Sequence, residues 1–255
     1  MSHLTVPPPA DAVAREPAPW RFWGTLAWGV AAFAAFYLIQ FAALLLLVIW
    51  WHADPTAPTA DLKTLGSNAI VLSVLTLAAA PATLLVVALA VKLARSRFVD
   101  YLALKPVDIE TLVFALACTI AYGSAVEILT YLLGRPLVEP FVADIYRSTR
   151  ASGSWVLMLA AVVIAAPVLE ELLFRGFFMR GWSASRLGVP GAVILTSLIW
   201  AGMHVQYDWY TVVEIFGLGL LFGYLRLRSG STLTTVATHA VYSAIAIVQA
   251  AILVG

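Results

Sequence analysis

Long apolar runs separated by short polar segments dominate the pattern of the chain. They cover residues 23–51, 69–94, 109–133, 155–179, 190–205, 211–227 and 233–254. A helix that crosses a bilayer needs about 20 predominantly apolar residues, and most of these runs reach that length. The pattern predicts an all-α, polytopic integral membrane helical bundle with about seven transmembrane helices, within a range of six to eight.

The segments outside the runs differ in character. Residues 1–21 are rich in proline and hold no apolar run, which predicts a disordered cytosolic tail. Residues 135–153 carry Phe141, Val142, Ile145 and Tyr146 at helical spacing, which favours an amphipathic helix at the membrane interface. In the sixth run, the pair Gly219 and Gly223 offers a face for close helix packing.

The composition supports a membrane protein and excludes most soluble folds. Hydrophobic residues make up 62% of the 255 residues and charged residues 11%, against about 25% charged in a typical soluble domain. The formal net charge of +1 gives no basis for nucleic-acid binding. Cys118 is the single cysteine, so the chain can form neither an internal disulfide nor a zinc site with several thiolates.

Loop charges predict the orientation. With the N-terminus in the cytosol, the inner segments hold ten Lys and Arg residues and the outer segments hold four. The positive-inside rule therefore favours a cytosolic N-terminus and an external C-terminus. We expect an integral protein of the cell, or inner, membrane.

Three charged residues lie inside the fourth run: Glu170, Glu171 and Arg175. Each ionised group there costs about 2.5 to 3.5 kcal/mol, so the charges need compensation or a function. Glu171 and Arg175 are four residues apart and can neutralise each other. Glu170 projects about 100° away and has no local partner, so it is a candidate general base. The alternative is a buried ion-pair network that only fixes helix packing.

Two further runs carry histidines. His204 follows Trp200 by four residues, and His239 precedes Ser243 by four, so each pair shares a helix face. A single histidine in a span is often a hydrogen-bonded packing residue. Two of them in the same C-terminal half as the glutamate pair favour a shared polar site.

These residues form three ordered motifs, namely Glu170-Glu171-x-x-x-Arg175, Trp200-x-x-x-His204 and His239-x-x-x-Ser243. The set resembles the CPBP family, which includes CAAX prenyl proteases such as Ras-converting enzyme, and bacteriocin-processing and abortive-infection membrane proteins. The family usually has Phe at the place of Trp200 and Asn at the place of Ser243. The resemblance covers about residues 151–246 and implies a CPBP-like catalytic core at 151–255. The apolar runs before it predict N-terminal transmembrane helices at 22–150.

The resemblance implies an intramembrane endopeptidase that acts on a peptide or membrane-protein substrate, for example of CAAX type. In that interpretation Glu170 and His204 activate a water molecule, while His239 and Ser243 stabilise the oxyanion. Glu171 and Arg175 hold the first motif in register. Serine is shorter than asparagine, so the oxyanion site is expected to be weaker or to include a water.

Alternatives remain open at this point. Glu170, His204 and His239 could together bind zinc, although the chain has no His-Glu-x-x-His motif and we favour a metal-free reaction with no cofactor. Two other functions also fit buried ionisable groups: a proton-coupled transporter, and a non-catalytic immunity-type membrane protein. The partners expected are the lipid bilayer and the substrate; the sequence indicates no oligomeric state.

Overall fold

The computed structural model describes residues 20–53 and 65–255, and every regular element in these ranges is helical. The predicted tail at 1–21 lies outside the described residues except for its last two positions. Five long helices are regular: α1 Phe22–Ala53, α2 Ala69–Leu93, α4 Ile109–Leu132, α10 Trp209–Ser229 and α11 Thr232–Leu253. The short elements are η2 Leu65–Ser67, α3 Phe98–Tyr101, α5 Pro140–Ser152 and α9 Gly188–Gly202.

A sixth long helix is continuous but composite. It consists of α6 Trp155–Leu159, η3 Ala160–Ala165, α7 Ala166–Glu171, η4 Leu172–Phe178 and α8 Met179–Ser183, in which η3 and η4 are π-helical. In the part of the chain that the structure describes, six helices are long and apolar enough to cross a membrane, and α9 is a shorter apolar helix. The predicted polytopic helical bundle is therefore confirmed.

The run at 190–205 was predicted too long at its C-terminal end. Its helix, α9, stops at Gly202, and the next residues form turns. In these turns the amide of His204 donates to the carbonyl of Ala201, and the amide of Tyr207 donates to the carbonyl of His204. At 1.5 Å per residue, its 15 residues span about 22 Å, less than the roughly 30 Å of a hydrocarbon core. His204 consequently lies in a loop and not on the helix that hydropathy predicted.

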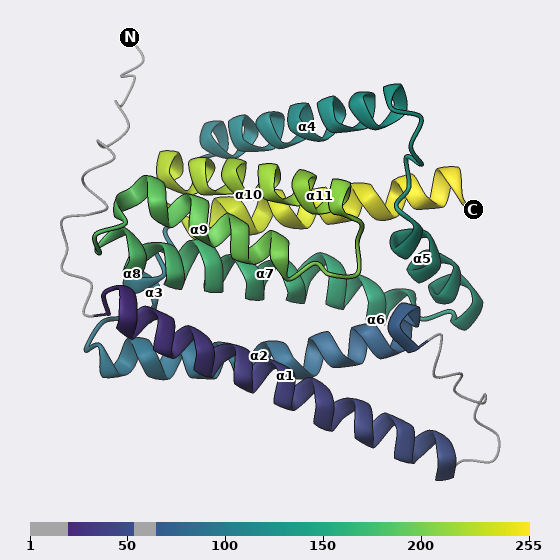
Figure 1. The fold of residues 1–255 in the computed structure, drawn as a ribbon, viewed down its shortest axis with the longest axis horizontal. Coiled ribbons are helices and arrows are strands. Elements are labelled where there is room, and N and C mark those ends of the chain that lie inside the picture. The colour runs from purple at the N-terminus through teal and green to yellow at the C-terminus, as the bar shows by residue number, and fades with distance from the viewer. Residues whose placement is uncertain (1–19, 54–64) are drawn as a thin grey trace.

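The bundle is layered (Figure 1). The pair α1 and α2 lies on one side, and α4 lies on the opposite side against α10 and α11. The composite helix and α9, α10 and α11 lie between them. From Glu171 to Met179 the composite helix is buried inside the bundle, whereas Val156 and Ile164 near its start are exposed.

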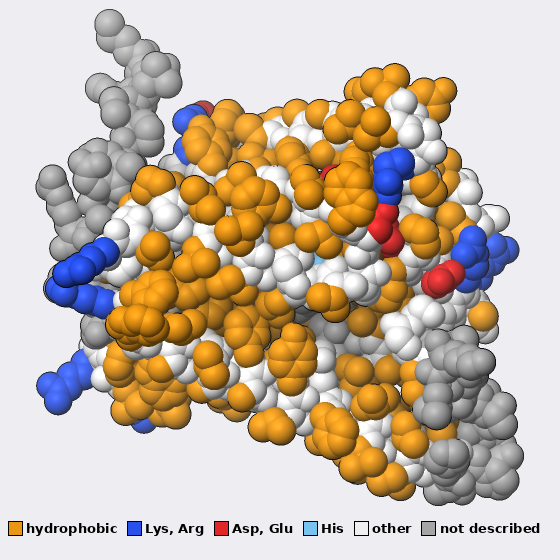
Figure 2. Space-filling model, viewed as in Figure 1, with side chains coloured by type: hydrophobic (Ala, Val, Ile, Leu, Met, Phe, Trp, Pro, Cys, Tyr) orange, Lys and Arg blue, Asp and Glu red, His pale blue; other side chains and the backbone are white. Residues whose placement is uncertain are grey.

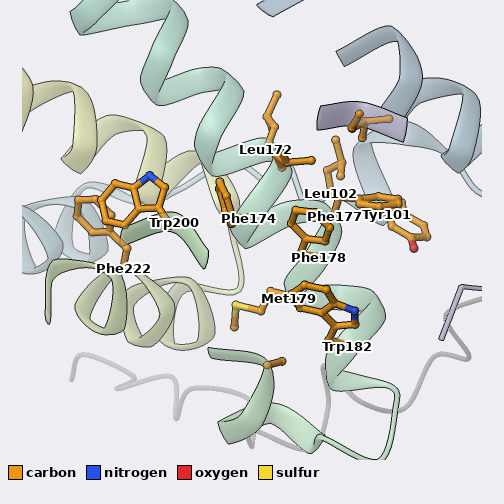
Figure 3. Close-up of a cluster of buried hydrophobic side chains, with 14 of the residues drawn as sticks. Tyr101, Leu102, Leu172, Phe174, Phe177, Phe178, Met179, Trp182, Trp200 and Phe222 are labelled. Carbon is orange, nitrogen blue, oxygen red and sulfur yellow. The ribbon is translucent and has the colours of Figure 1, made fainter. Parts of the chain in front are cut away.

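An aromatic cluster joins the composite helix to α1 (Figure 3). The rings of Phe178 and Trp182 are stacked with centroids 4.7 Å apart. Gly29 of α1 leaves room for this cluster, since a Cβ there would lie within 2.4 Å of two atoms of the Phe178 ring. This contact anchors the end of the composite helix that follows the glutamate pair.

Close packing of α10 on α9 depends on the predicted glycine pair. A Cβ on Gly219 would lie 2.9 Å from Ser197 Cβ, and one on Gly223 would lie 2.6 Å from Val193 Cγ1. Both distances are shorter than ordinary carbon contacts, so the backbones meet where a side chain would not fit. The predicted close-packing face is confirmed.

The surface fits a membrane environment. Figure 2 shows apolar side chains along the visible flank of the bundle and most of the charged side chains gathered toward its two ends. The predicted amphipathic helix is present as α5, and it turns Ala143, Ile145, Tyr146 and Thr149 inward. It packs against α2 and α11, so its apolar face is covered by protein.

Candidate active site

The glutamate pair lies on an irregular part of the composite helix. Glu170 and Glu171 end α7, a short α-helical stretch between the π-helical segments η3 and η4. Pro167 is the second residue of α7. Proline has no N–H and its ring crowds the carbonyl four residues earlier, inside η3, which a wider turn relieves. The regular helix predicted over this run is thus interrupted on both sides of the carboxylates, an arrangement common at functional sites.

Glu171 is the centre of a buried charged group. Its Oε1 atom accepts from Arg175 Nη1 at 3.1 Å, and His239 Nδ1 on α11 lies 3.1 Å from the same oxygen. Glu171 is 0% exposed and Arg175 1%. The predicted pair of Glu171 and Arg175 is confirmed, and the third motif joins it.

Arg175 is fixed by more than its carboxylate. Its Nη2 donates to the carbonyl of Gly219 at 3.1 Å, and its Cζ lies 4.6 Å from the ring centroid of Trp200 and 5.5 Å from that of Phe222. These cation–π contacts compensate further for burial of the guanidinium. Two polar atoms, Glu171 Oε2 and Arg175 Nε, are buried without a hydrogen-bond partner among the described residues.

The sequence suggested that Glu170 has no partner, but the structure gives it one. Trp200 Nε1 on α9 donates to its Oε2 atom at 2.6 Å. The prediction failed because it considered only neighbours on the same helix, whereas this donor comes from a residue 30 positions away. Phe, which the family usually has at the place of Trp200, would lack this donor.

His204 remains beside Trp200 even though the helix has ended. Its Nδ1 lies 2.8 Å from the carbonyl oxygen of Trp200, and the two rings meet edge to face at 5.3 Å. A carbonyl oxygen only accepts, so Nδ1 carries the proton and Nε2 of the neutral ring carries the lone pair. The imidazole also stacks on Tyr207, at 5.8 Å and 11° between ring planes.

A cavity of about 280 Å³ unites four of the six predicted site residues. Its polar lining includes Glu170, His204, His239 and Ser243. Glu171 and Arg175 do not line it, so they lie behind the cavity and support it. Leu72 and Thr76 of α2 contribute to the wall, so the N-terminal helices also shape the site.

Two cavity residues were missed in the sequence. Tyr207 and Tyr242 line this cavity and also a second one of about 170 Å³ that Glu139 and Glu214 help to line. Burial raises the pKa of the Tyr207 phenol well above its usual value, so this side chain stays protonated at neutral pH. Tyr207 follows His204 by three residues and Tyr242 follows His239 by three, so spacing from the histidines was the available signal.

The predicted zinc alternative finds no support in the donor geometry. Within residues 20–53 and 65–255, no group of three or more His, Cys, Asp or Glu lies close enough to hold a metal ion. His204 and His239 both use Nδ1 in hydrogen bonds, and Glu170 uses one oxygen. In this structure these three side chains are not grouped closely enough to hold a metal ion, and the zinc alternative stays a prediction.

Glu127 of α4 is a further carboxylate within a membrane-length helix, and it lines neither cavity. Its side chain is exposed on the outside of the bundle. This position agrees with the absence of Glu127 from the three motifs and makes it a useful comparison for Glu170.

Comparison with known proteins supports the family assignment of this region. Residues 152–245 match the family model of the Rce1-like type II CAAX prenyl endopeptidases. An uncharacterized 24.3 kDa protein of Escherichia coli is 34% identical over 115 residues, which are 43% of this chain and 52% of that protein. The chain thus spans about half the length of the curated relative it matches. No solved structure matches.

Proposed function

Residues 152–245 match the family model of the Rce1-like type II CAAX prenyl endopeptidases, and from this match we propose that the protein is an intramembrane endopeptidase. The observation that carries the proposal is the cavity at which all three motifs meet. It places an anchored carboxylate, an imidazole of defined tautomer, a second imidazole and a hydroxyl around one space. These are the groups that hydrolysis of an amide requires.

Glu170 and His204 are proposed to activate water. One oxygen of Glu170 is held by Trp200, and the other has no partner among the described residues, so it is available to a water in the cavity. His204 presents the lone pair of Nε2, since its Nδ1 proton is engaged by the Trp200 carbonyl. A water bonded to both loses its proton to this pair as its oxygen attacks the scissile carbonyl carbon.

His239 and Ser243 are proposed to stabilise the resulting oxyanion. Glu171 accepts from His239 Nδ1, so His239 can donate through Nε2 only as an imidazolium, with the Glu171 carboxylate as its counter-ion. Ser243 lies one helical turn further along α11 and its hydroxyl has no hydrogen bond within the described residues, which leaves it free to donate. Both donors would strengthen as negative charge develops on the oxygen.

The reaction closes with proton return. When the C–N bond of the tetrahedral intermediate breaks, the leaving amine takes up the proton that Glu170 and His204 removed from water. Glu171 and Arg175 take no part in this transfer, because they lie behind the cavity; their role is to hold His239 and the composite helix in place.

We propose a lipidated CAAX-type peptide as the substrate, with the cysteine lipid lying among the membrane helices. A quenched fluorescent peptide with a farnesylated cysteine followed by three residues tests this on the purified protein in detergent micelles. Release of the C-terminal tripeptide, identified by mass, supports the substrate class, and the same peptide without farnesyl is the control. If co-expressed membrane proteins are cut only when Glu170 is intact while the farnesyl peptide is not, the CAAX class is wrong.

The proposed orientation keeps the N-terminus in the cytosol and the protein in the cell membrane. The structure places Arg21, Arg180 and Arg228 near the starts and ends of helices that meet at one end of the bundle. If the end of the bundle that carries these arginines faces the cytosol, the C-terminus lies outside, and an alkaline phosphatase fused after Gly255 should be active. The fusion should be inactive if the orientation is reversed.

A further inference from the structure

Trp200 makes more specific contacts than an aromatic residue that only fills space in the core. Its side chain is 2% exposed, and it touches members of all three motifs. We propose that Trp200 is a positioning residue that holds both halves of the water-activating pair, Glu170 and His204, in their working orientation. This inference rests on the proposed function of that pair.

The indole N–H fixes Glu170. The donor lies on α9 and the acceptor on α7, so the bond of 2.6 Å ties the carboxylate to a different helix. A buried N–H needs an acceptor, and for Trp200 Glu170 Oε2 is the acceptor. Because one oxygen is held, the rotation of the carboxylate is restricted and the second oxygen keeps a constant direction.

The backbone carbonyl of the same residue fixes His204. The carbonyl accepts from Nδ1 at 2.8 Å, which selects the tautomer with its lone pair on Nε2. Trp200 thus orients the carboxylate with its side chain and the imidazole with its main chain. Glu170 and His204 are therefore both held by the same residue.

The indole itself has little freedom to turn. Arg175 Cζ lies over its ring at 4.6 Å, and the rings of His239 and His204 meet it at 5.4 and 5.3 Å, at 80° and 82° between ring planes. Phe222 packs beside it at 6.0 Å, as Figure 3 also shows. A rotation that broke the bond to Glu170 would also disrupt these contacts.

Two other indole donors show that this pairing is particular to the site. Trp182 Nε1 donates to the carbonyl of Phe22 at 3.3 Å, and Trp20 Nε1 donates to the carbonyl of Ala90 at 2.9 Å. Trp200 alone among the tryptophans of the described part donates to a carboxylate. Trp182 is 1% exposed, so it provides a matched control for the loss of a buried indole donor.

The test replaces Trp200 by Phe, which removes the N–H but keeps an aromatic ring and the backbone carbonyl. We expect kcat on the farnesylated peptide to fall about 100-fold, because a misplaced catalytic group costs about that much, while KM stays within about twofold because substrate binding is not changed. Trp182→Phe should leave kcat within about twofold of the wild-type value. Equal losses of kcat in the two variants would overturn the inference.

Nuclear magnetic resonance of the indole groups gives a readout independent of turnover. In ¹⁵N-labelled protein, the indole N–H signal of Trp200 is assigned as the one that is absent from the spectrum of Trp200→Phe. In the wild type this signal should lie downfield of the other indole signals, because its acceptor is a carboxylate. Glu170→Ala should move it upfield and leave the Trp182 signal unchanged. A Trp200 signal that does not respond to Glu170→Ala would overturn the inference.

The inference and the proposed function fail in different ways. If Glu170→Ala cleaves the peptide as fast as wild type, the proposed function is wrong whatever Trp200 does. If Glu170→Ala is inactive and Trp200→Phe retains the wild-type kcat, the function stands and the positioning role is wrong.

Discussion

His239 Nδ1 lies 3.1 Å from Glu171 Oε1, although 68 residues separate them in the chain. The same oxygen accepts from Arg175, so one carboxylate oxygen is shared by two nitrogen donors from two helices. The second glutamate of the first motif therefore connects it to the third motif. The first glutamate, Glu170, faces the cavity and connects to the second motif through Trp200.

Loss of the shared carboxylate should destabilise the fold. Glu171→Ala leaves Arg175 buried without its counter-charge, and breaking a buried pair in this way costs about 3–5 kcal/mol. The free energy of unfolding, measured by titrating mixed micelles with a denaturing detergent, should fall by about that amount. Asp144→Ala breaks the exposed pair with Arg147 and should change it by no more than about 1 kcal/mol. Equal effects of the two substitutions would contradict the buried network.

The contact between α9 and α10 should tolerate no added side-chain volume. Gly219→Ala places a Cβ 2.9 Å from Ser197 Cβ and 3.2 Å from its Cα, so the two backbones must separate. The expected destabilisation is about 1–3 kcal/mol, as for overpacked cores. Gly202→Ala is the matched control, since a Cβ there meets nothing within 4 Å. An unchanged thermal midpoint for Gly219→Ala would show that the helices do not meet here as described.

Much of this architecture follows from sequence patterns alone. Hydropathy gave the number of helices and most of their bounds, because burial in lipid constrains length and composition strongly. The motif spacing identified Glu170, His204, His239 and Ser243, which share one cavity. The pair of Glu171 and Arg175 was predictable because both residues lie on the same helix.

The remaining features depend on contacts between helices and could not be predicted. The bond from Trp200 to Glu170 joins two helices, and no local rule signals it. The π-helical segments beside α7 shift the faces of the helix. The end of α9 at Gly202 is invisible to hydropathy, because Met203 and Val205 continue the apolar pattern.

The hydroxyl of Ser243 should matter for turnover and little for folding. Ser243→Ala removes a proposed oxyanion donor, and loss of one such donor costs about 10²- to 10³-fold in kcat. Ser243→Asn restores a donor and should keep kcat at or above the wild-type value. The rates are measured on the farnesylated peptide, with the thermal midpoint as the folding control. Wild-type turnover by Ser243→Ala would remove this residue from the mechanism.

Chelation should not abolish cleavage. The described His, Cys, Asp and Glu side chains form no group suited to hold a metal, and the proposed water activation relies on Glu170 and His204 alone. Peptide cleavage after treatment with 1,10-phenanthroline, followed by dialysis, should equal that of the untreated protein. Loss of activity that added zinc restores would instead establish a metal-dependent reaction.

The most direct measurement compares cleavage by wild type with that by Glu170→Ala, His204→Ala and the control Glu127→Ala. All four proteins are purified from membranes and matched for folded protein by their thermal midpoints. The account predicts that Glu170→Ala and His204→Ala lose cleavage of the farnesylated peptide, while Glu127→Ala, which changes a carboxylate outside both cavities, cleaves at the wild-type rate. Residual cleavage that is equal in all four proteins would contradict the account.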